Sequence, residues 1–125
     1  MGYKIDHALA TYYSDCLWTI EDHDYEKLNW DTSNSKTKPT LEDLQSKTTA
    51  LNTAEPMKRL RFERDRLLTE SDWVVTKAAE TGVAETDAWK TYRQALRDLP
   101  ASASPKLDSF YELDLTSVTW PTKPS

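Results

Sequence analysis

Aliphatic side chains are scarce in this 125-residue chain. Leu, Ile, Val and Phe together supply 22 positions, which is less than a fifth of the sequence. Such a low fraction indicates disorder only when the net charge is also high, and the formal charge here is only -5, so we do not expect a disordered chain. Five Trp and six Tyr residues are present instead. Because aromatic side chains bury a large area, the question is what they pack against.

Other absences narrow the class of protein. Two glycines leave no Gly-rich loop that could cradle a phosphate, which argues against a nucleotide-dependent enzyme. The single cysteine, Cys16, excludes an intrachain disulfide and fits a reducing compartment. No apolar run approaches the roughly 20 residues that span a bilayer, and the first 13 residues lack the apolar stretch of a signal peptide. We therefore expect a soluble protein that stays inside the cell that made it and has no membrane partner.

Catalytic and metal-binding patterns are also missing. His7 and His23 have no spacing that would pair either of them with Cys16 or a serine as base and nucleophile. The acidic stretch at residues 21–24 resembles a metal site only superficially, because adjacent residues in one turn rarely converge on one ion. We expect no catalytic residue, no metal and no cofactor, and hence a protein that is not an enzyme.

Five cations between residues 57 and 66 are typical of a nucleic-acid-binding helix. At helical spacing, however, three of them face an acid four positions later: Arg59 with Glu63, Arg61 with Asp65, and Arg66 with Glu70. Residues 1–56 add 5 cations and 10 anions, an excess of negative charge that repels a phosphate backbone. We therefore expect no nucleic-acid partner.

The N-terminal part of the sequence, residues 1–38, predicts a helix and a β-hairpin. The helix is expected over Ile5–Tyr13, where apolar residues recur at spacings of four and three. Two β-prone runs follow, Cys16–Ile20 and Tyr25–Trp30, separated by four polar residues that suit a hairpin loop. An isolated hairpin is marginal in water, so these strands need another surface to cover them.

Residues 39–100 predict a helical region. Thr40 and Asp43 resemble a capping box, which indicates a helix from residue 40 to about residue 54. Pro56 then predicts a break before a second helix at residues 57–69, and the apolar stripe shifts across it by nine residues, which is not a helical repeat. A single bent helix of about 30 residues is the alternative.

Two further helices are expected before the C-terminal tail. Ser71 and Asp72 indicate the start of one, and Gly82 suits its left-handed end. Thr86 caps the other, in which apolar residues recur at i, i+3, i+7 and i+10 until Pro100 stops the helix. The tail, residues 101–125, predicts an extended run at 113–120. The sequence thus indicates a mainly α protein of the α+β class with a small N-terminal hairpin element, a helical middle and an extended C-terminal tail.

The aromatic group formed by Trp73, Trp89, Tyr92 and Trp120 has two interpretations. In the first, these side chains pack between helices as an ordinary core. In the second, some of them form a partner surface, because Trp, Tyr and Arg are enriched at interface hot spots and Arg93 and Arg97 lie close by in the sequence. The sequence leaves both interpretations open.

Three segments in order resemble a known family. They are RFERDRLLTESDW at residues 61–73, AWKTYRQALRDLP at residues 88–100 and LTSVTWPTKP at residues 115–124. Together they resemble the tail assembly chaperone-like proteins of tailed bacteriophages, particularly the small tail-fibre assembly chaperones. The resemblance covers about 65 residues and sets residues 56–125 apart as a chaperone-like domain. The stretch at residues 74–86 departs from the commonest pattern, and the preceding part looks like a variable N-terminal module.

The resemblance implies a non-enzymatic role in helping a phage tail-fibre protein, or another tail protein, to fold, trimerise or join the virion. It implies action in the host-cell cytoplasm during assembly, with the mature virion tail as a second location and a homo-oligomer such as a trimer as one possible state. The alternative is a permanent structural adaptor of the tail or baseplate. The residues that the resemblance points to for partner binding are Trp73, Trp89, Tyr92, Arg93, Leu96, Arg97, Asp98, Leu99, Trp120 and Pro121.

Overall fold

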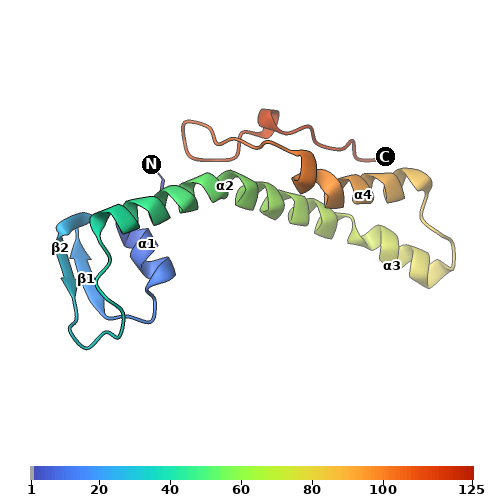
Figure 1. Cartoon of the computed structure of the whole chain (residues 1–125). Coiled ribbons are helices and arrows are strands. Elements are labelled where there is room, and N and C mark those ends of the chain that lie inside the picture. The colour runs from blue at the N-terminus through green and yellow to red at the C-terminus, as the bar shows by residue number, and fades with distance from the viewer. Residues whose placement is uncertain (1) are drawn as a thin grey trace. The chain divides into compact units, whose positions relative to one another are not determined.

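The computed structural model describes residues 2–125 and divides the chain into two compact units, an N-terminal unit (Met1–Glu55) and a C-terminal unit (Pro56–Ser125) (Figure 1). In chain order the elements are α1 (Ile5–Tyr12), β1 (Trp18–Glu21), β2 (Asp24–Trp30), α2 (Leu41–Glu70), α3 (Asp72–Thr81), α4 (Asp87–Ser102) and the 3-10 helix η1 (Leu115–Ser117). The predicted fold class, mainly α with a small N-terminal hairpin, is confirmed. None of the helices in residues 2–125 is long and apolar enough to cross a membrane.

The hairpin of β1 and β2 turns more tightly than the sequence predicts. Its loop has two residues, Asp22 and His23, instead of the expected four. Both have positive φ, 53° and 58°, which is the geometry of a type I′ turn and one that Asp and His adopt more readily than most residues. Because this turn matches the natural twist of the strands, pairing extends to Glu21 and Asp24 at the tip.

The core of the N-terminal unit shows what two of the tryptophans do. Trp18 and Trp30 face each other across the hairpin and pack against the core. Their indole N–H groups donate to backbone carbonyls, Trp18 to Tyr13 at 3.2 Å and Trp30 to Lys36 at 3.1 Å. The two rings therefore add apolar area without leaving a polar atom unpaired. The buried residues of this core are Ala8, Leu9, Leu28 and Leu44.

The start of α2 agrees with the predicted capping box. The Thr40 hydroxyl accepts the backbone N–H of Asp43 at 3.1 Å, and the Asp43 carboxylate accepts the N–H of Thr40 at 3.3 Å. The predicted break at Pro56 is wrong, because α2 continues through this residue as one 30-residue helix (Figure 1). The alternative of a single long helix is the one that the structure adopts.

Tertiary contacts just before Pro56 account for this continuity. Proline has no N–H for the carbonyl four residues earlier, which weakens a helix interior. The turn before it is held by the N-terminal segment: the Asn52 side chain accepts the N–H of Tyr3 at 2.9 Å and donates to its carbonyl at 3.3 Å. The Tyr3 hydroxyl also donates to the buried Glu55 carboxylate at 2.6 Å. These contacts join residues about 50 positions apart, so the sequence around Pro56 alone does not predict them.

The C-terminal unit has its own core, formed by Leu60, Leu99 and Val118. Trp120 packs against this core, and its indole N–H donates to the carbonyl of Leu115 at 3.1 Å. The predicted stop of α4 at Pro100 is wrong by two residues, since the helix ends at Ser102. Ala103 packs against the same core, and its N–H bonds to the Leu99 carbonyl at 3.0 Å, which stabilises the extra turn.

The tail is less extended than the sequence predicts. The run expected at residues 113–120 is interrupted by η1. Asp114 causes the interruption, because its carboxylate accepts both the N–H of Thr116 at 3.0 Å and its hydroxyl at 2.6 Å. This capping favours a turn over an extended strand.

Candidate functional site

The junction between α2 and α3 is built around one buried hydroxyl. Ser71 is 1% exposed, and its Oγ donates to the carbonyl of Leu68 at 3.0 Å. Its own N–H bonds back to Leu67 and Leu68. These bonds use backbone groups that would otherwise be orphaned where one helix ends and the next begins. The direction of α3 is thereby tied to the last turn of α2.

Arg93 of α4 fixes the same junction from the other side. One guanidinium nitrogen donates to the Leu68 carbonyl at 2.9 Å and to the Ser71 hydroxyl at 2.6 Å, and another pairs with the Asp72 carboxylate at 2.9 Å. The side chain is 9% exposed, so these charge-assisted bonds act in a poorly solvated place. Arg93 therefore connects the end of α2, the start of α3 and the middle of α4.

The loop between α3 and α4 returns the chain onto α3. Gly82 ends α3 in the left-handed conformation, with a φ of 71°, and its N–H bonds to the Ala78 carbonyl at 3.0 Å. The Thr81 hydroxyl then accepts the N–H of Val83 at 3.2 Å. Thr86 caps α4 as predicted, because its hydroxyl accepts the N–H of Trp89 at 3.4 Å. A tight end and a capped start bring Trp89 to the side of α3.

Three aromatic rings meet between these helices. Trp73 and Trp89 lie edge to face, with centroids 5.7 Å apart and planes at 77°. Trp89 makes a similar contact with Tyr92, at 5.9 Å and 75°. Edge-to-face geometry is favoured by the ring quadrupoles and stabilises the pair beyond its buried area. The burial falls off along this row, from 5% exposure at Tyr92 to 53% at Trp73.

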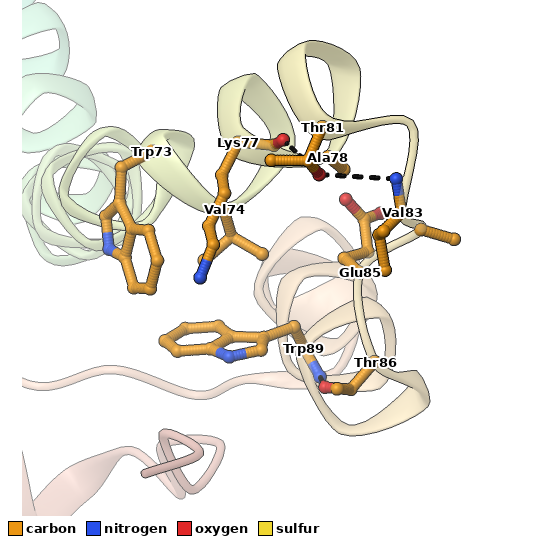
Figure 2. A pocket seen from close by; sticks show the side chains of 10 residues that line it. Trp73, Val74, Lys77, Ala78, Thr81, Val83, Glu85, Thr86 and Trp89 are labelled. Carbon is orange, nitrogen blue, oxygen red and sulfur yellow. Dashed lines mark hydrogen bonds between the residues drawn. The ribbon is translucent and has the colours of Figure 1, made fainter.

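A cleft of about 230 Å³ opens beside the two indoles (Figure 2). We call it the indole cleft. Apart from Trp73 and Trp89 it is lined by Val74, Lys77, Ala78, Thr81, Val83, Ala84, Glu85 and Thr86. Its walls are therefore mainly apolar, with one cationic and one anionic side chain. Figure 2 shows Lys77 reaching down from α3 toward the indoles, whereas Glu85 lies on the loop side.

Comparison with known proteins gives the family of this chain. Residues 57–125 match the family described as phage tail assembly chaperone protein, and they make up more than half of the chain. The chain belongs to this family. No curated protein and no solved structure matches it. Membership indicates a phage tail assembly chaperone, a class with a non-enzymatic role, and it confirms the family resemblance seen in the sequence.

In this chaperone the candidate partner-binding residues differ in how exposed their side chains are. Tyr92, Arg93, Leu96 and Leu99 are buried, with Leu96 at 0% exposure. Their side chains are covered by the rest of the C-terminal unit in this conformation. Trp73, Arg97 and Asp98 are exposed, and Trp89, Trp120 and Pro121 are half-buried. The stretch at residues 74–86, which departs from the commonest family pattern, forms the rest of α3 and the loop, and so brings Trp73 to Trp89.

Pro121 lines a second groove in the chaperone, to which Tyr92 of the aromatic row also contributes. This groove, of about 550 Å³, runs between the tail and the small residues Ala88, Thr91 and Ala95 of α4. The tail is tied down beyond it by an ion pair of 3.1 Å between Lys123 and Glu70. The Lys123 ammonium, by its hydrogen bond above all, lowers the pKa of Glu70 below its ordinary value of 4.5.

Sequence reasoning missed three residues that line the indole cleft. Lys77, Val83 and Glu85 were not among the candidate residues, although all three line it. The sequence contains one signal for Val83, because it follows a helix-ending glycine, where an apolar residue commonly packs back on the helix. In the structure Val83 lines the cleft but is 70% exposed. Among the described residues, no group of three or more His, Cys, Asp or Glu is placed to hold a metal ion.

Several cations in the basic segment of α2 contact acidic or aromatic side chains of the C-terminal unit. Arg66 pairs with Glu70, as predicted, and also with Glu63. Arg64 pairs with Asp65, and Arg59 stacks over the ring of Tyr111 at 5.4 Å. Of the pairs predicted at a spacing of four, that of Arg66 with Glu70 is present, and Arg59, Arg64 and Arg66 face acidic or aromatic groups of the same chain.

Proposed function

We propose that this chaperone binds a tail-fibre protein of its phage during assembly, and that it assists folding, trimerisation or attachment of the fibre. The observation that carries the proposal is the exposed part of the aromatic row, Trp73 at 53% exposure beside the half-buried Trp89. Large aromatic side chains on rigid helices are typical anchors of protein interfaces. In this proposal the indole cleft is the contact surface, and the buried Tyr92, Arg93 and Leu96 hold it in shape.

The physical need for such a partner follows from the fibre. Long trimeric fibres rich in β-structure pair strands that are distant in sequence, so they fold slowly and expose strand edges meanwhile. Exposed edges and apolar side chains aggregate. A small protein with a preformed apolar cleft can cover one such segment until trimerisation buries it. No bond is made or broken in this role.

Co-expression with the fibre gene of the same phage tests the proposal. We expect the chaperone to raise the yield of soluble fibre and to be captured with it by a tag on the fibre. Trp73→Ser should abolish both effects. Phe62→Ser is the matched control, because Phe62 is another exposed large apolar residue, at 76%, on α2 and outside the indole cleft. Equal soluble fibre yield with and without the chaperone would refute the proposal.

The same phage distinguishes an assembly factor from a permanent adaptor. Purified virions analysed by quantitative mass spectrometry should lack the chaperone, or contain it far below the copy number of the fibre. A fixed ratio to the fibre in mature virions would instead identify a structural adaptor of the tail.

A further inference from the structure

The indole cleft has a charged side chain without a partner at its wall. The Lys77 ammonium extends from α3 toward the two indoles (Figure 2). It makes no ion pair or hydrogen bond with any other residue among those that the structure describes. Four other cations of the C-terminal unit, Arg64, Arg66, Arg93 and Lys123, pair with carboxylates of the same chain. Lys77 thus lies beside an apolar cleft, and no acidic side chain among the described residues pairs with its positive charge.

The cleft also favours one kind of apolar side chain. Trp73 and Trp89 already touch edge to face at 5.7 Å, so no flat ring can insert between them. The apolar part of the remaining wall consists of short side chains, Val74, Ala78, Val83 and Ala84. A volume of about 230 Å³ has room for several waters, and waters beside the apolar part of the wall would find few hydrogen-bond partners there. A branched aliphatic side chain can displace them with a net gain.

Glu85 restricts where a partner can carry negative charge. Its carboxylate lies on the loop side of the cleft, away from the end of Lys77 (Figure 2). Like charges brought together repel each other and so disfavour a wrong partner. A segment that is acidic on both sides of its apolar residue is therefore disfavoured, whereas a single carboxylate at the Lys77 end is attracted.

We propose that the indole cleft recognises a short segment of a partner protein in which a Leu, Ile or Val lies next to one acidic residue. The aliphatic side chain enters the cleft beside the indoles, and the carboxylate pairs with Lys77. This proposal names the chemistry of the contact and rests on the proposed function, in which the same cleft binds a tail protein.

Selection from a library of random heptapeptides against the immobilised full chain tests it. The wild type should enrich peptides with an aliphatic residue adjacent to Asp or Glu. Lys77→Glu should reverse the charge preference to Lys or Arg and keep the aliphatic residue. Lys77→Met should keep the aliphatic preference without a charge preference. An individual enriched peptide should bind Lys77→Glu at least about tenfold more weakly than the wild type, measured by fluorescence anisotropy.

Lys90→Glu is the matched control, because Lys90 is an exposed lysine on α4 that does not line the cleft. It should select the same peptides as the wild type. Since Lys77 and Lys90 are both exposed, circular dichroism should show all three variants folded. Enrichment that does not change with Lys77→Glu, or no enrichment at all, would overturn the inference. So would sedimentation showing that the wild type is an oligomer that Trp73→Ser converts to a monomer, because a second copy would then fill the cleft.

Failure of this inference can be told apart from failure of the proposed function. If the wild type and Lys77→Glu capture the fibre equally well, the fibre proposal stands and the acidic–aliphatic motif is refuted. If the library yields the motif but the fibre is not captured, the cleft chemistry stands and the partner is a different protein.

Discussion

Arg93 is a candidate partner-binding residue that lies buried in the C-terminal unit, where it connects three helices. Its guanidinium bonds to the Leu68 carbonyl, the Ser71 hydroxyl and the Asp72 carboxylate, while its Nε is buried without a hydrogen-bond partner in the chain. The buried, unpaired Nε costs free energy, and the bonds made by the other two guanidinium nitrogens offset this cost and fix a geometry. The geometry fixed here is the angle of α3 against α4, which places Trp73 beside Trp89.

Replacing Arg93 by methionine should therefore destabilise the chaperone strongly. Methionine keeps the apolar stem but removes the charge-assisted hydrogen bonds to the Leu68 carbonyl, the Ser71 hydroxyl and the Asp72 carboxylate, and a hydrogen bond to a charged group contributes roughly 1.5–3 kcal/mol. We expect a loss of about 2–4 kcal/mol in the free energy of unfolding by urea. Arg97→Met on the exposed face of α4 is the control and should stay within about 0.5 kcal/mol. Equal losses in the two variants would show that the Arg93 bonds do not determine stability.

The tail contact of Lys123 with Glu70 predicts a pH dependence. Lys123, and after it Arg66, lowers the pKa of Glu70 below 4.5 in the folded chain. A lowered pKa means that the contact stabilises the fold above the unfolded pKa, and that this contribution is lost as the pH falls through the folded value. Because both side chains are about half exposed, the effect on stability should be small and reduced by salt.

Carbon-detected NMR of the Glu70 carboxyl group is the direct measurement. Its titration midpoint should lie below 4.5 in the wild type and rise toward that value in Lys123→Met. Lys123→Arg should keep the lowered midpoint. A midpoint that is the same in the wild type and in Lys123→Met would mean that the tail does not lie against Glu70 in solution.

At the scale of elements, α2 carries a proline that its surroundings tolerate. Pro56→Ala supplies the missing N–H and removes the clash of the ring with the preceding turn, changes that stabilise a helix interior by up to about 3 kcal/mol. We expect a higher urea midpoint and stronger helical circular dichroism. Thr53→Ala, an exposed position in the same helix, should gain only a few tenths of a kcal/mol. A loss of stability in Pro56→Ala would show instead that the proline sets a bend that the native contacts need.

The elements that the sequence predicts well are those whose signals are local. The caps at Thr40 and Thr86 and the glycine at 82 each act within a few residues, and all three lie where they were expected. The prediction fails where a contact between residues distant in sequence determines the local structure. Pro56 is tolerated beside the Tyr3 and Asn52 pairing, 49 residues apart in sequence, and no local pattern contains that information.

The shift of the apolar stripe in α2 has a similar cause. A spacing of nine residues between Leu51 and Leu60 is not a helical repeat and predicts a discontinuity. In the structure Leu51 packs against the core of the N-terminal unit, whereas Leu60 belongs to the core of the C-terminal unit. One helix that serves two cores does not need one continuous stripe. In the candidate site, likewise, the sequence supplied the aromatics but not Lys77, because nothing local shows that a lysine will lack an acidic neighbour.

At the scale of the whole molecule, the two units differ in charge. Residues 1–55 contain 5 cations and 10 anions, so they carry a net charge of -5, the same as the full chain, and residues 56–125 are neutral overall. The family match covers residues 57–125 and therefore falls in the neutral unit. Each unit has its own buried cluster. The family match and the excess negative charge thus fall in different parts of the chain.

If the C-terminal unit is complete in itself, a fragment of residues 56–125 should fold and keep the indole cleft. Its core of Leu60, Leu99 and Val118 lies entirely within the fragment. About 70 residues is close to the size at which a single core gives only a few kcal/mol, so we expect cooperative urea unfolding with a lower midpoint than the full chain. Pro56 at the first position suits a helix start, where its missing N–H costs nothing.

Tryptophan fluorescence gives the measurement, because the fragment retains Trp73, Trp89 and Trp120 and loses the two hairpin tryptophans. A single transition with a blue-shifted native emission is expected, together with capture of the same partner as the full chain. Leu60→Ala should abolish the transition, since truncating a fully buried leucine costs about 2–5 kcal/mol and would exceed the stability of so small a core. A fragment without a cooperative transition would show that the N-terminal unit is needed to hold the chaperone part folded.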